Sequence, residues 1–415
     1  MARIRPFKAL RPKKEEVAKV ASPPYDVLGR IEAKELTKDN PISFLHVVKA
    51  EIDLPDGIDA YDDRVYEKSR ENLNILINEG HLIGEDSPSF YLYTQEIGAH
   101  IQNGLVCLAS VDEYDKDQIK KHELTRKAKE EDRTRHIDTL NAQTGPVFLS
   151  YRDDDSTAGL HDIYERIRKR EPLYKFEGDG GVLHTVWRID DAKEIEEIQN
   201  IIKRAESLYI ADGHHRSKSA SLVREARRKK NPNHTGREEY NYFLSVIFPH
   251  TELRIMAYNR VVKDLNGLNK KEFIDRVGKD FIIEEVSGRY EPEAKHHFGM
   301  YLDGRWFHLI AREGTFLKDD VVDSIDASIL QANLLNPILS IKKPKQSDRI
   351  DFVGGIKGLD GLLHLIDSGK FALAFALYPT SMEELMSVAD AGLNMPPKST
   401  WFEPKLRSGL FVHQL

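Results

Sequence analysis

Apolar and polar positions repeat with two different periods along this chain, and the two periods predict a mixture of helices and strands. Tyr, Leu and Ile recur at helical spacing over residues 60–83, whereas apolar and polar residues alternate over 89–97 and 104–114 as in strands. Downstream, the same patterns predict strands at 146–152, 183–189, 241–249 and 253–262, and helices at 159–170, 192–205 and 216–230. This interleaving predicts a mixed α+β fold.

The last third of the chain continues the mixture. Residues 299–311 (GMYLDGRWFHLIA) predict a hairpin, because Asp303-Gly304 is a strong two-residue turn signal between two apolar runs. A helix is expected at 326–339 and a buried strand at 370–379. No repeat or low-complexity linker marks a boundary, so we expect an N-terminal α/β region at 1–115, a central core at 116–260 and a C-terminal α+β region at 261–415.

Residues 117–145 stand apart because they are nearly all charged or polar. Their sparse apolar positions predict an exposed helix, or a pair of helices, that stops at Gly145-Pro146 and begins near His122-Glu123. Residues spaced three or four apart would share one polar face: Thr125, Lys129, Asp132, Arg133 and His136.

Composition narrows the class of protein. The net charge of −7 over 415 residues gives no broad positive field, which disfavours nucleic acid as a partner. The single cysteine, Cys107, excludes disulfides within the chain and a cysteine metal cage, and it fits a reducing cytoplasm. No segment is apolar for long enough to span a bilayer, and residues 1–16 lack the apolar stretch of a signal peptide. We therefore expect a cytoplasmic protein.

The strongest chemical signal is LYIADGHHRSKSA at 208–220, in which a short apolar strand runs into Asp212-Gly213-His214-His215-Arg216 and then a helix. Gly213 permits a positive φ, and the first amides of a helix attract phosphate oxygens. Arg216 can hold an oxyanion and Asp212 can bind Mg²⁺ or a substrate hydroxyl. In the structural alternative, Asp212 caps the helix, Arg216 pairs with a carboxylate and the histidines are surface residues. The common nucleotide signatures are absent from the sequence.

This motif resembles the Gly-x-His-Arg loop with which the ParB/sulfiredoxin superfamily holds nucleotide phosphates. Sulfiredoxins have a reactive cysteine where this chain has His214, so the resemblance argues against thiol repair. The Asp-Gly-His-His-Arg form resembles that of free L-serine kinases. Four motifs, SPPYDV, HELT, LYIADGHHR and MPPKSTWFEPKLRSGL, are similar to those of a large, long uncharacterised bacterial and archaeal family over nearly the whole chain.

The resemblance implies a ParB/sulfiredoxin-like core with additional α/β subdomains. It also implies transfer of a phosphoryl group from ATP to free L-serine, with Mg²⁺, in serine or cysteine metabolism. The residues alone support only a phosphate site.

Roles follow from this resemblance and from position in the sequence. A glutamate base is implied, and Glu123 matches it best, although it could equally be a solvated carboxylate at a helix start. We expect catalysis from Glu123, Asp212 and His215, metal contacts from Asp212 and Glu123, and phosphate contacts from Gly213, His214, His215, Arg216 and Arg133. Substrate or supporting roles, with packing as the alternative, are assigned to Tyr25, Asp26, His122, Lys398, Ser399 and Thr400, and Lys405 lies further along.

Two other functions compete with the kinase. A nucleotide-switched DNA-binding protein would need a cationic surface, and REARRKK at 224–230 is a basic patch, although a helix end favours basic residues in any case. A phosphohydrolase would cleave nucleotides without an acceptor. The sequence leaves open whether the donor is ATP, ADP or pyrophosphate, which residues bind the amino acid, and the oligomeric state, with a homodimer among the options.

Overall fold

The computed structural model describes residues 3–415, which form two compact units. Unit 1 contains the chain up to Leu253 together with Pro404–Leu415, and unit 2 is Arg254–Glu403. Both units combine helices with sheets, so the α+β prediction is confirmed. The expected boundary at 260/261 falls inside β14 (Tyr258–Val262) of unit 2, and the return of the last residues to unit 1 was not expected, since no local pattern signals it.

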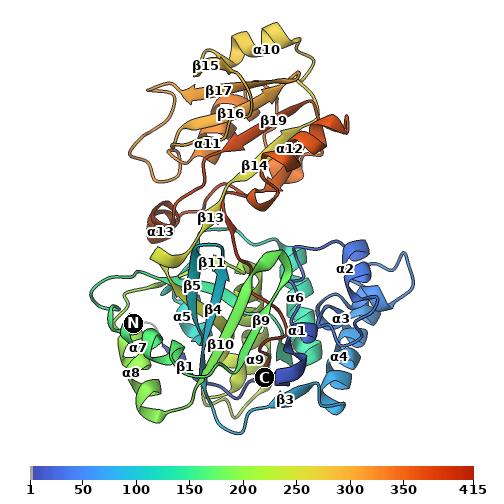
Figure 1. The fold of residues 1–415 in the computed structure, drawn as a ribbon, viewed down its shortest axis with the longest axis vertical. Coiled ribbons are helices and arrows are strands. Elements are labelled where there is room, and N and C mark those ends of the chain that lie inside the picture. The colour runs from blue at the N-terminus through green and yellow to red at the C-terminus, as the bar shows by residue number, and fades with distance from the viewer. Residues whose placement is uncertain (1–2) are drawn as a thin grey trace. The chain divides into compact units, whose positions relative to one another are not determined.

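Unit 1 is built on a nine-stranded mixed sheet with the order β6-β11-β8-β12-β5-β4-β10-β9 and β1 beside β5 (Figure 1). The β11–β6 and β12–β8 pairs are parallel, and the other pairs are antiparallel. Its strands are β1 (Ile4–Arg5), β4 (Phe90–Ile97), β5 (His100–Ser110), β6 (Ile119–Lys120), β8 (Val147–Tyr151), β9 (Tyr174–Glu177), β10 (Leu183–Ile189), β11 (Leu208–Asp212) and β12 (Tyr242–Pro249). Two small pairs are β2 (Leu10–Pro12) with β3 (Leu82–Gly84) and β7 (Ala142–Gln143) with β21 (His413–Gln414).

Two groups of helices flank this sheet. In Figure 1, α7 (Gly159–Arg168) and α8 (Ala192–Ile202) lie to the left of the strands, and their buried Ile and Leu side chains join the core of the sheet. The helices that lie to the right of the strands in Figure 1 share a second hydrophobic core with Val412 of the C-terminal segment. The remaining helices of unit 1 are α1 (Val17–Val20), α2 (Arg30–Thr37), α3 (Leu45–Val48), α4 (Asp63–Asn78), α5 (Val111–Asp115), α6 (Lys127–Leu140) and α9 (His214–Lys230), with 3-10 turns η1 (Lys14–Glu16), η2 (Ala50–Asp53), η3 (Asp179–Gly181), η4 (Glu239–Asn241) and η5 (His250–Glu252).

Unit 2 contains an antiparallel sheet with the order β15-β17-β16-β19-β14-β18. Its strands are β14, β15 (Phe281–Val286), β16 (His297–Leu302), β17 (Arg305–Ala311), β18 (Ile350–Gly354) and β19 (Leu373–Leu377), and β13 (Ile255–Met256) pairs separately with β20 (Trp401–Phe402). Its helices are α10 (Lys270–Val277), α11 (Asp326–Leu330), α12 (Gly358–Asp367) and α13 (Met382–Asp390), with the π turn η6 (Gln331–Leu335) and the 3-10 turns η7 (Pro344–Gln346) and η8 (Gly355–Lys357). The predicted hairpin is confirmed: Asp303 and Gly304 have φ of 51° and 77°, as a type I′ turn requires.

The charged segment at 117–145 differs from its prediction. Helix α6 begins only at Lys127, after β6, so Thr125 and Glu123 precede the helix. The polar face is also not exposed, because Asp132 and His136 are buried. Their polar atoms are satisfied locally: the Tyr66 hydroxyl donates to Asp132 at 2.9 Å, and His136 Nε2 lies 3.0 Å from the Ser69 hydroxyl. A charged face can therefore be buried when neighbours supply its hydrogen bonds.

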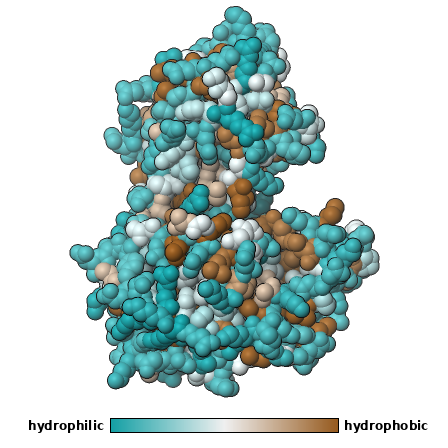
Figure 2. Space-filling view, in the orientation of Figure 1, coloured by the Kyte–Doolittle hydropathy of each residue, from teal (hydrophilic) through white to brown (hydrophobic). Residues whose placement is uncertain are grey.

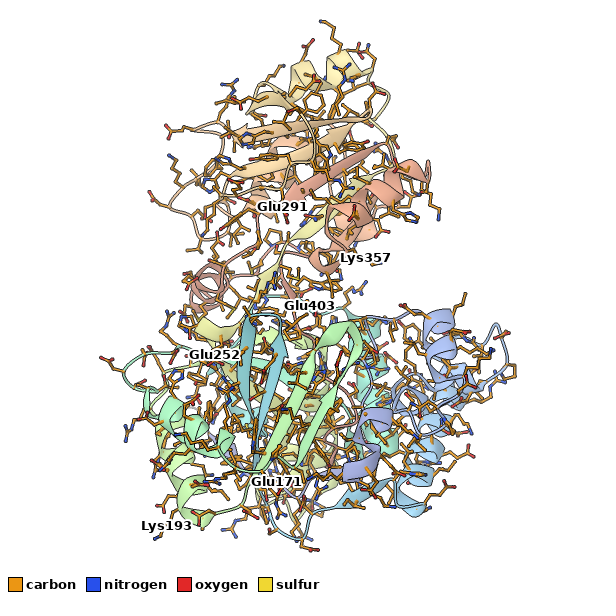
Figure 3. All side chains as sticks on the ribbon, viewed as in Figure 1. Glu171, Lys193, Glu252, Glu291, Lys357 and Glu403 are labelled. Carbon is orange, nitrogen blue, oxygen red and sulfur yellow. The ribbon has the colours of Figure 1, made fainter. Side chains whose placement is uncertain are left out.

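The visible surface is mostly hydrophilic, with apolar residues scattered over it (Figure 2). Among the helices of residues 3–415, none is both long enough and apolar enough to cross a membrane. Some carboxylates stabilise the fold: Glu252 of η5 (Figure 3) accepts hydrogen bonds from the backbone and side-chain nitrogens of Asn103 in β5.

Candidate functional site

The turn between β11 and α9 has the backbone that the sequence predicts. Gly213 has a φ of 97° and lies immediately before the helix. A Cβ atom at this position would lie 3.1 Å from the guanidinium carbon of Arg216, so a larger residue would meet both strain and a tight contact. The 17-residue helix α9 follows directly, and its first amides have no acceptor within the helix.

Asp212 is bound by cations rather than acting as a helix cap. Its Oδ2 atom lies 3.0 Å from Lys405 Nζ, and its Oδ1 accepts a hydrogen bond from the Gly213 amide at 2.7 Å. Arg216 Nη2 lies 4.0 Å from the same carboxylate. Burial opposes the charged form, but Lys405 and Arg216 outweigh it and hold the pKa of Asp212 well below its usual range. Asp212 is therefore an ionised acceptor and a weak base at neutral pH.

Lys405 is a candidate functional residue whose partner the sequence did not predict. It lies 193 residues after Asp212, and only the return of Pro404–Leu415 to unit 1 brings the two together. Buried side chains hold this returning segment, since Gln95 Nε2 donates to the Lys405 carbonyl at 2.9 Å. The basic character of the C-terminal motif was the only available signal.

The two histidines of the motif connect it to the HELT segment at 122–125. The His122 amide donates to His214 Nε2 at 3.4 Å, and the two imidazole rings meet edge to face at 4.4 Å. The Arg126 amide donates to His215 Nε2 at 3.1 Å. Burial and the nearby His214 hold the pKa of His122 well below its usual range, so its ring is neutral. The structure thus brings together two motifs that are about 90 residues apart.

Glu123 lies in this connecting segment and not at a helix start. Because α6 begins at Lys127, Glu123 is not at a helix start, and the alternative in which it complements the dipole of that helix is wrong. The carboxylate is half-buried and follows His122, whose backbone contacts the motif. Its catalytic role remains a prediction.

Beside the motif is a small cavity that two predicted arginines share. Tyr25, Arg133 and Arg216 line it together with Thr144 and Ser408. The space open to the centres of water molecules is about 30 Å³, which suits a water molecule and not a nucleotide. Arg216 Nη1 also donates to the Pro146 carbonyl. The predicted residues Arg133, Arg216 and Tyr25 therefore meet in one place.

Arg133 is neutralised inside the chain. Its Nε and Nη2 atoms donate to the two oxygens of Asp132 at 2.9 and 3.0 Å, and its guanidinium lies 4.2 Å from the centre of the Tyr25 ring. Burial raises the pKa of Tyr25 to about 12, and the charge of Asp26 adds to this effect. Tyr25 is therefore a neutral hydroxyl at physiological pH, and Asp26 beside it is exposed.

The other predicted residues belong to unit 2. Lys398 is exposed with a φ of 63°, the buried Ser399 hydroxyl donates to the Pro396 carbonyl at 2.7 Å, and Thr400 is half-buried. Lys398 and Lys405 are therefore close together in the sequence MPPKSTWFEPK but belong to different units.

Metal ligands are sparse. Among residues 3–415, no group of three or more His, Cys, Asp or Glu side chains is arranged to hold an ion. Nucleotide-bound Mg²⁺ commonly takes only one or two protein carboxylates and keeps its waters. The ionised Asp212 could be one such carboxylate. Glu123, which follows His122 beside the motif, could be the other.

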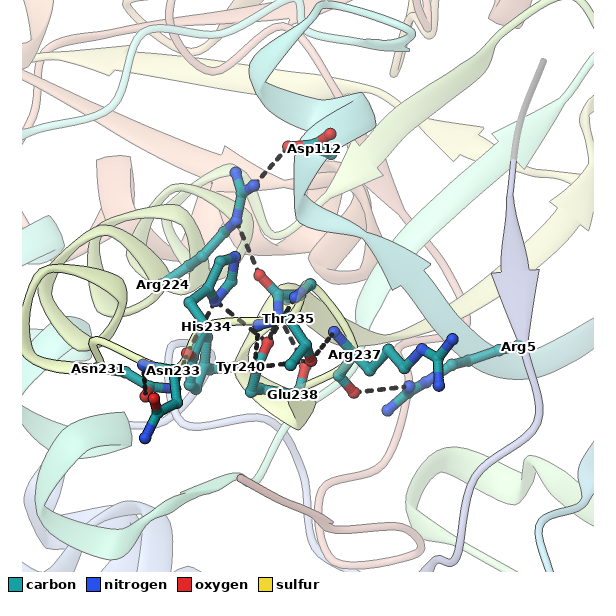
Figure 4. A network of polar contacts seen from close by, with 12 residues as sticks. Arg5, Asp112, Arg224, Asn231, Asn233, His234, Thr235, Arg237, Glu238 and Tyr240 are labelled. Carbon is teal, nitrogen blue, oxygen red and sulfur yellow. Dashed lines mark hydrogen bonds and ion pairs between the residues drawn. The ribbon is translucent and has the colours of Figure 1, made fainter.

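The basic stretch at 224–230 is largely occupied by ion pairs. Arg224 contacts Asp112, as Figure 4 shows, and its Nη1 lies 3.0 Å from Asp115. Arg227 contacts Asp138 at 3.0 Å, and Lys229 contacts Glu225 within the same helix. Cations that are neutralised in this way form a poor surface for phosphate backbones, which weakens the DNA-binding alternative.

Comparisons with solved structures give distant likenesses. A conserved hypothetical protein from Pyrococcus furiosus has 12% identity and a TM-score of 0.35, with 74% of this chain and 94% of that chain covered. A free serine kinase in complex with AMP has 13% identity and a TM-score of 0.36, with 74% and 92% covered. SbnI with a C-terminal truncation from Staphylococcus aureus has 12% identity and a TM-score of 0.39, with 74% and 86% covered. Values this low transfer no chemistry to this chain.

Sequence comparison places the chain in a family. No curated protein matches it. A family model described as a protein of unknown function, DUF1015, matches residues 4–328, well over half of the chain. The chain therefore belongs to the DUF1015 family.

Proposed function

We propose that this protein is a kinase that transfers the terminal phosphoryl group of ATP to the hydroxyl of free L-serine, giving ADP and O-phospho-L-serine. The observation that supports the proposal is the turn at Asp212–Arg216, in which a left-handed glycine, the start of α9 and a cationic side chain adjoin the HELT segment. Serine as the acceptor follows from the resemblance of this motif to free L-serine kinases.

The turn supplies what a phosphate needs. Backbone amides at the start of α9 and the guanidinium of Arg216 can share the charge of the terminal phosphate oxygens. Because the neighbouring cavity admits only a water molecule, phosphate binding requires Arg216 to exchange its bond to Pro146 for the ligand. Lys405 keeps Asp212 ionised while this exchange occurs.

Phosphoryl transfer also needs a group that receives the proton of the serine hydroxyl. Asp212 is a poor choice because its pKa is held so low. We assign this role to Glu123, which is half-buried beside the motif, and we assign to Asp212 and His215 the orientation of phosphates and acceptor. Mg²⁺ bound with the nucleotide would neutralise phosphate charge, with Asp212 and Glu123 as its protein contacts.

The test uses the purified full-length protein with Mg²⁺ and ATP, with and without L-serine. We expect ADP release that depends on serine and a phosphoserine product identified by mass spectrometry. ADP release that is indifferent to serine would instead identify a phosphohydrolase, and no turnover with ATP, ADP or pyrophosphate would refute a kinase. A pool of other amino acids and sugars serves as the control for acceptor choice.

A further inference from the structure

Unit 2 contains a second cavity, which is much larger than the one in unit 1. Its volume is about 330 Å³, within the range of small-molecule sites. Its lining combines cations with apolar walls, chiefly Arg260, Gln331, Leu335, Lys343, Phe352 and Pro396. All of these residues belong to unit 2, so the cavity is complete within that unit.

Arg260 is the unusual member of this lining, because it is a buried cation without an anion. Its side chain donates to two backbone carbonyls, those of Tyr258 and, at 3.0 Å, Lys398, and it lies 5.4 Å from the centre of the Phe352 ring. Only 3% of the residue is exposed, and no carboxylate of residues 3–415 pairs with it. Burial lowers the pKa of Arg260 to about 10, so it remains charged at neutral pH. Buried charges are normally paired, which makes an external anion the missing partner.

The rim of the cavity adds positive charge. Lys342 and Lys343 are exposed and line it, and no Asp or Glu is among the lining residues. The summed field of one buried and two exposed cations favours a ligand with more than one negative charge. A phosphate monoester, which is close to a dianion at neutral pH, meets that condition better than a single carboxylate does.

Gln331 supplies a complementary polar group. Its Nε2 donates to the Ile341 carbonyl at 2.8 Å, whereas its buried Oε1 has no hydrogen-bond partner among residues 3–415. Gln331 begins the π turn η6, and such turns frequently occur at functional sites. A buried acceptor of this kind is suited to an N–H or O–H group of a ligand. The apolar walls of Leu335, Phe352 and Pro396 can cover the rest of that ligand.

We propose that this cavity binds a phosphorylated small molecule, no larger than a mononucleotide. Its phosphate would contact Arg260 and the rim lysines, its hydrogen-bond donor would reach Gln331 Oε1, and its organic part would pack against Phe352. The proposal accounts for MPPKS at 395–399, since Pro396 and Pro397 line the cavity and the Lys398 carbonyl holds Arg260. It stands independently of the function proposed for unit 1.

The experiment is isothermal titration of the full-length protein with three phosphate monoesters: AMP, O-phospho-L-serine and glucose 6-phosphate. Inorganic phosphate and succinate serve as reference ligands that lack the organic part or the phosphate. We expect at least one monoester to bind more tightly than both references. The three monoesters distinguish a nucleotide, an amino acid and a sugar as the organic part.

Three variants assign the binding to this cavity. Arg260→Met and Lys343→Glu should weaken it by about 10- to 100-fold, which is the typical loss for a charge-assisted contact. Lys357→Glu is the matched control, because Lys357 is an exposed lysine of unit 2 outside the cavity (Figure 3). Lys343 is exposed, so its substitution tests the site even if Arg260→Met impairs folding.

Two results would overturn the proposal. One is that no monoester binds the wild-type protein at millimolar concentration. The other is that Lys343→Glu and a folded Arg260→Met both keep wild-type affinity, because the ligand would then occupy another place. Neither result depends on whether unit 1 phosphorylates serine, which the release of ADP measures separately.

Discussion

The cations of unit 1 and the buried arginine of unit 2 differ in what neutralises them. In unit 1, Arg133 is bonded to both oxygens of Asp132, and Lys405 is bonded to Asp212. In unit 2, the contacts of the Arg260 guanidinium within the described part of the chain are to backbone carbonyls and an aromatic ring, and none is to a carboxylate. The cavities differ in the same sense, at about 30 Å³ in unit 1 and about 330 Å³ in unit 2.

This difference indicates how each unit can bind an anionic ligand. A cation that is paired inside the chain is held in place. An anionic ligand must then either replace its carboxylate partner or bind beside that partner. An arginine without a carboxylate gains its counterion only when a ligand arrives. We therefore expect unit 1 to position groups for chemistry and unit 2 to bind a ligand in a largely preformed site.

The largest expected effect is on stability, and it compares the two arginines directly. Asp132→Ala should lower the free energy of unfolding by about 3–5 kcal/mol, because it leaves the Arg133 side chain, which is only 12% exposed, without its carboxylate. Arg260→Met should cost at most about 2 kcal/mol, since it loses two bonds to backbone carbonyls but also removes a buried charge. Urea unfolding of both variants measures the change in the free energy of unfolding. Equal losses of free energy would show that the two arginines do not differ in how their charge is neutralised.

The second prediction concerns catalysis in unit 1. Asp212→Asn should lower serine-dependent ADP release by roughly 100-fold or more, because the neutral amide no longer holds Lys405 and Arg216 in place and offers no anionic oxygen to Mg²⁺. His215→Ala should act in the same direction. The matched control is Glu225→Gln, since Glu225 is an exposed carboxylate on α9 that pairs with Lys229. Steady-state kinetics decide, and turnover like that of the wild type in both variants would refute the site.

The two units should also respond to pH with opposite signs. Burial and Arg133 lower the pKa of His136 to about 3, so between that value and about 6.5 only the unfolded chain binds the proton. Stability from this group is present above pH 6.5 and falls by about 1.4 kcal/mol for each pH unit on acidification. Burial raises the pKa of Asp326 to about 7, so its contribution is present below about pH 4 and is lost as the pH rises to 7.

Hydrogen exchange of the full-length protein, measured from pH 5 to 8, resolves the two units. Asp326→Asn should protect unit 2 increasingly, relative to the wild type, as the pH rises. His136→Gln should protect unit 1 increasingly as the pH falls below 6.5. Variant and wild-type profiles that run parallel would mean that neither group has the pKa assigned to it.

The smallest expected effect concerns the backbone of the turn. Gly213→Ala should cost about 1–2 kcal/mol, because a Cβ at φ 97° is strained and would crowd the Arg216 guanidinium at 3.1 Å. Turnover should fall as Arg216 is displaced. Gly236→Ala is a useful control, since Gly236 also has a positive φ (84°) but has open space around it. Equal losses of turnover in the two variants would indicate general destabilisation.

Local patterns predicted much of the fold and part of the site. The strand, left-handed glycine and helix at 208–230 and the hairpin turn at Asp303-Gly304 follow from residues adjacent in sequence, and the structure confirms both. These successes share short-range causes, namely periodicity and turn chemistry.

Long-range pairing explains what the sequence did not predict. The burial of Asp132 and His136 depends on Tyr66 and Ser69, which come from a helix more than 60 residues earlier. The partner of Asp212 is Lys405, which no spacing rule connects to it. The cavity around Arg260 combines segments from β14, η6 and the C-terminal motif. That its lining contains no carboxylate can therefore be seen only in the structure.

The most direct measurement of the central claim is a crystal structure of the protein soaked with a non-hydrolysable ATP analogue and Mg²⁺. We predict that the terminal phosphate will lie against the first amides of α9 and the guanidinium of Arg216. A ligand bound elsewhere, with the turn at Asp212–Arg216 unoccupied, would contradict the account.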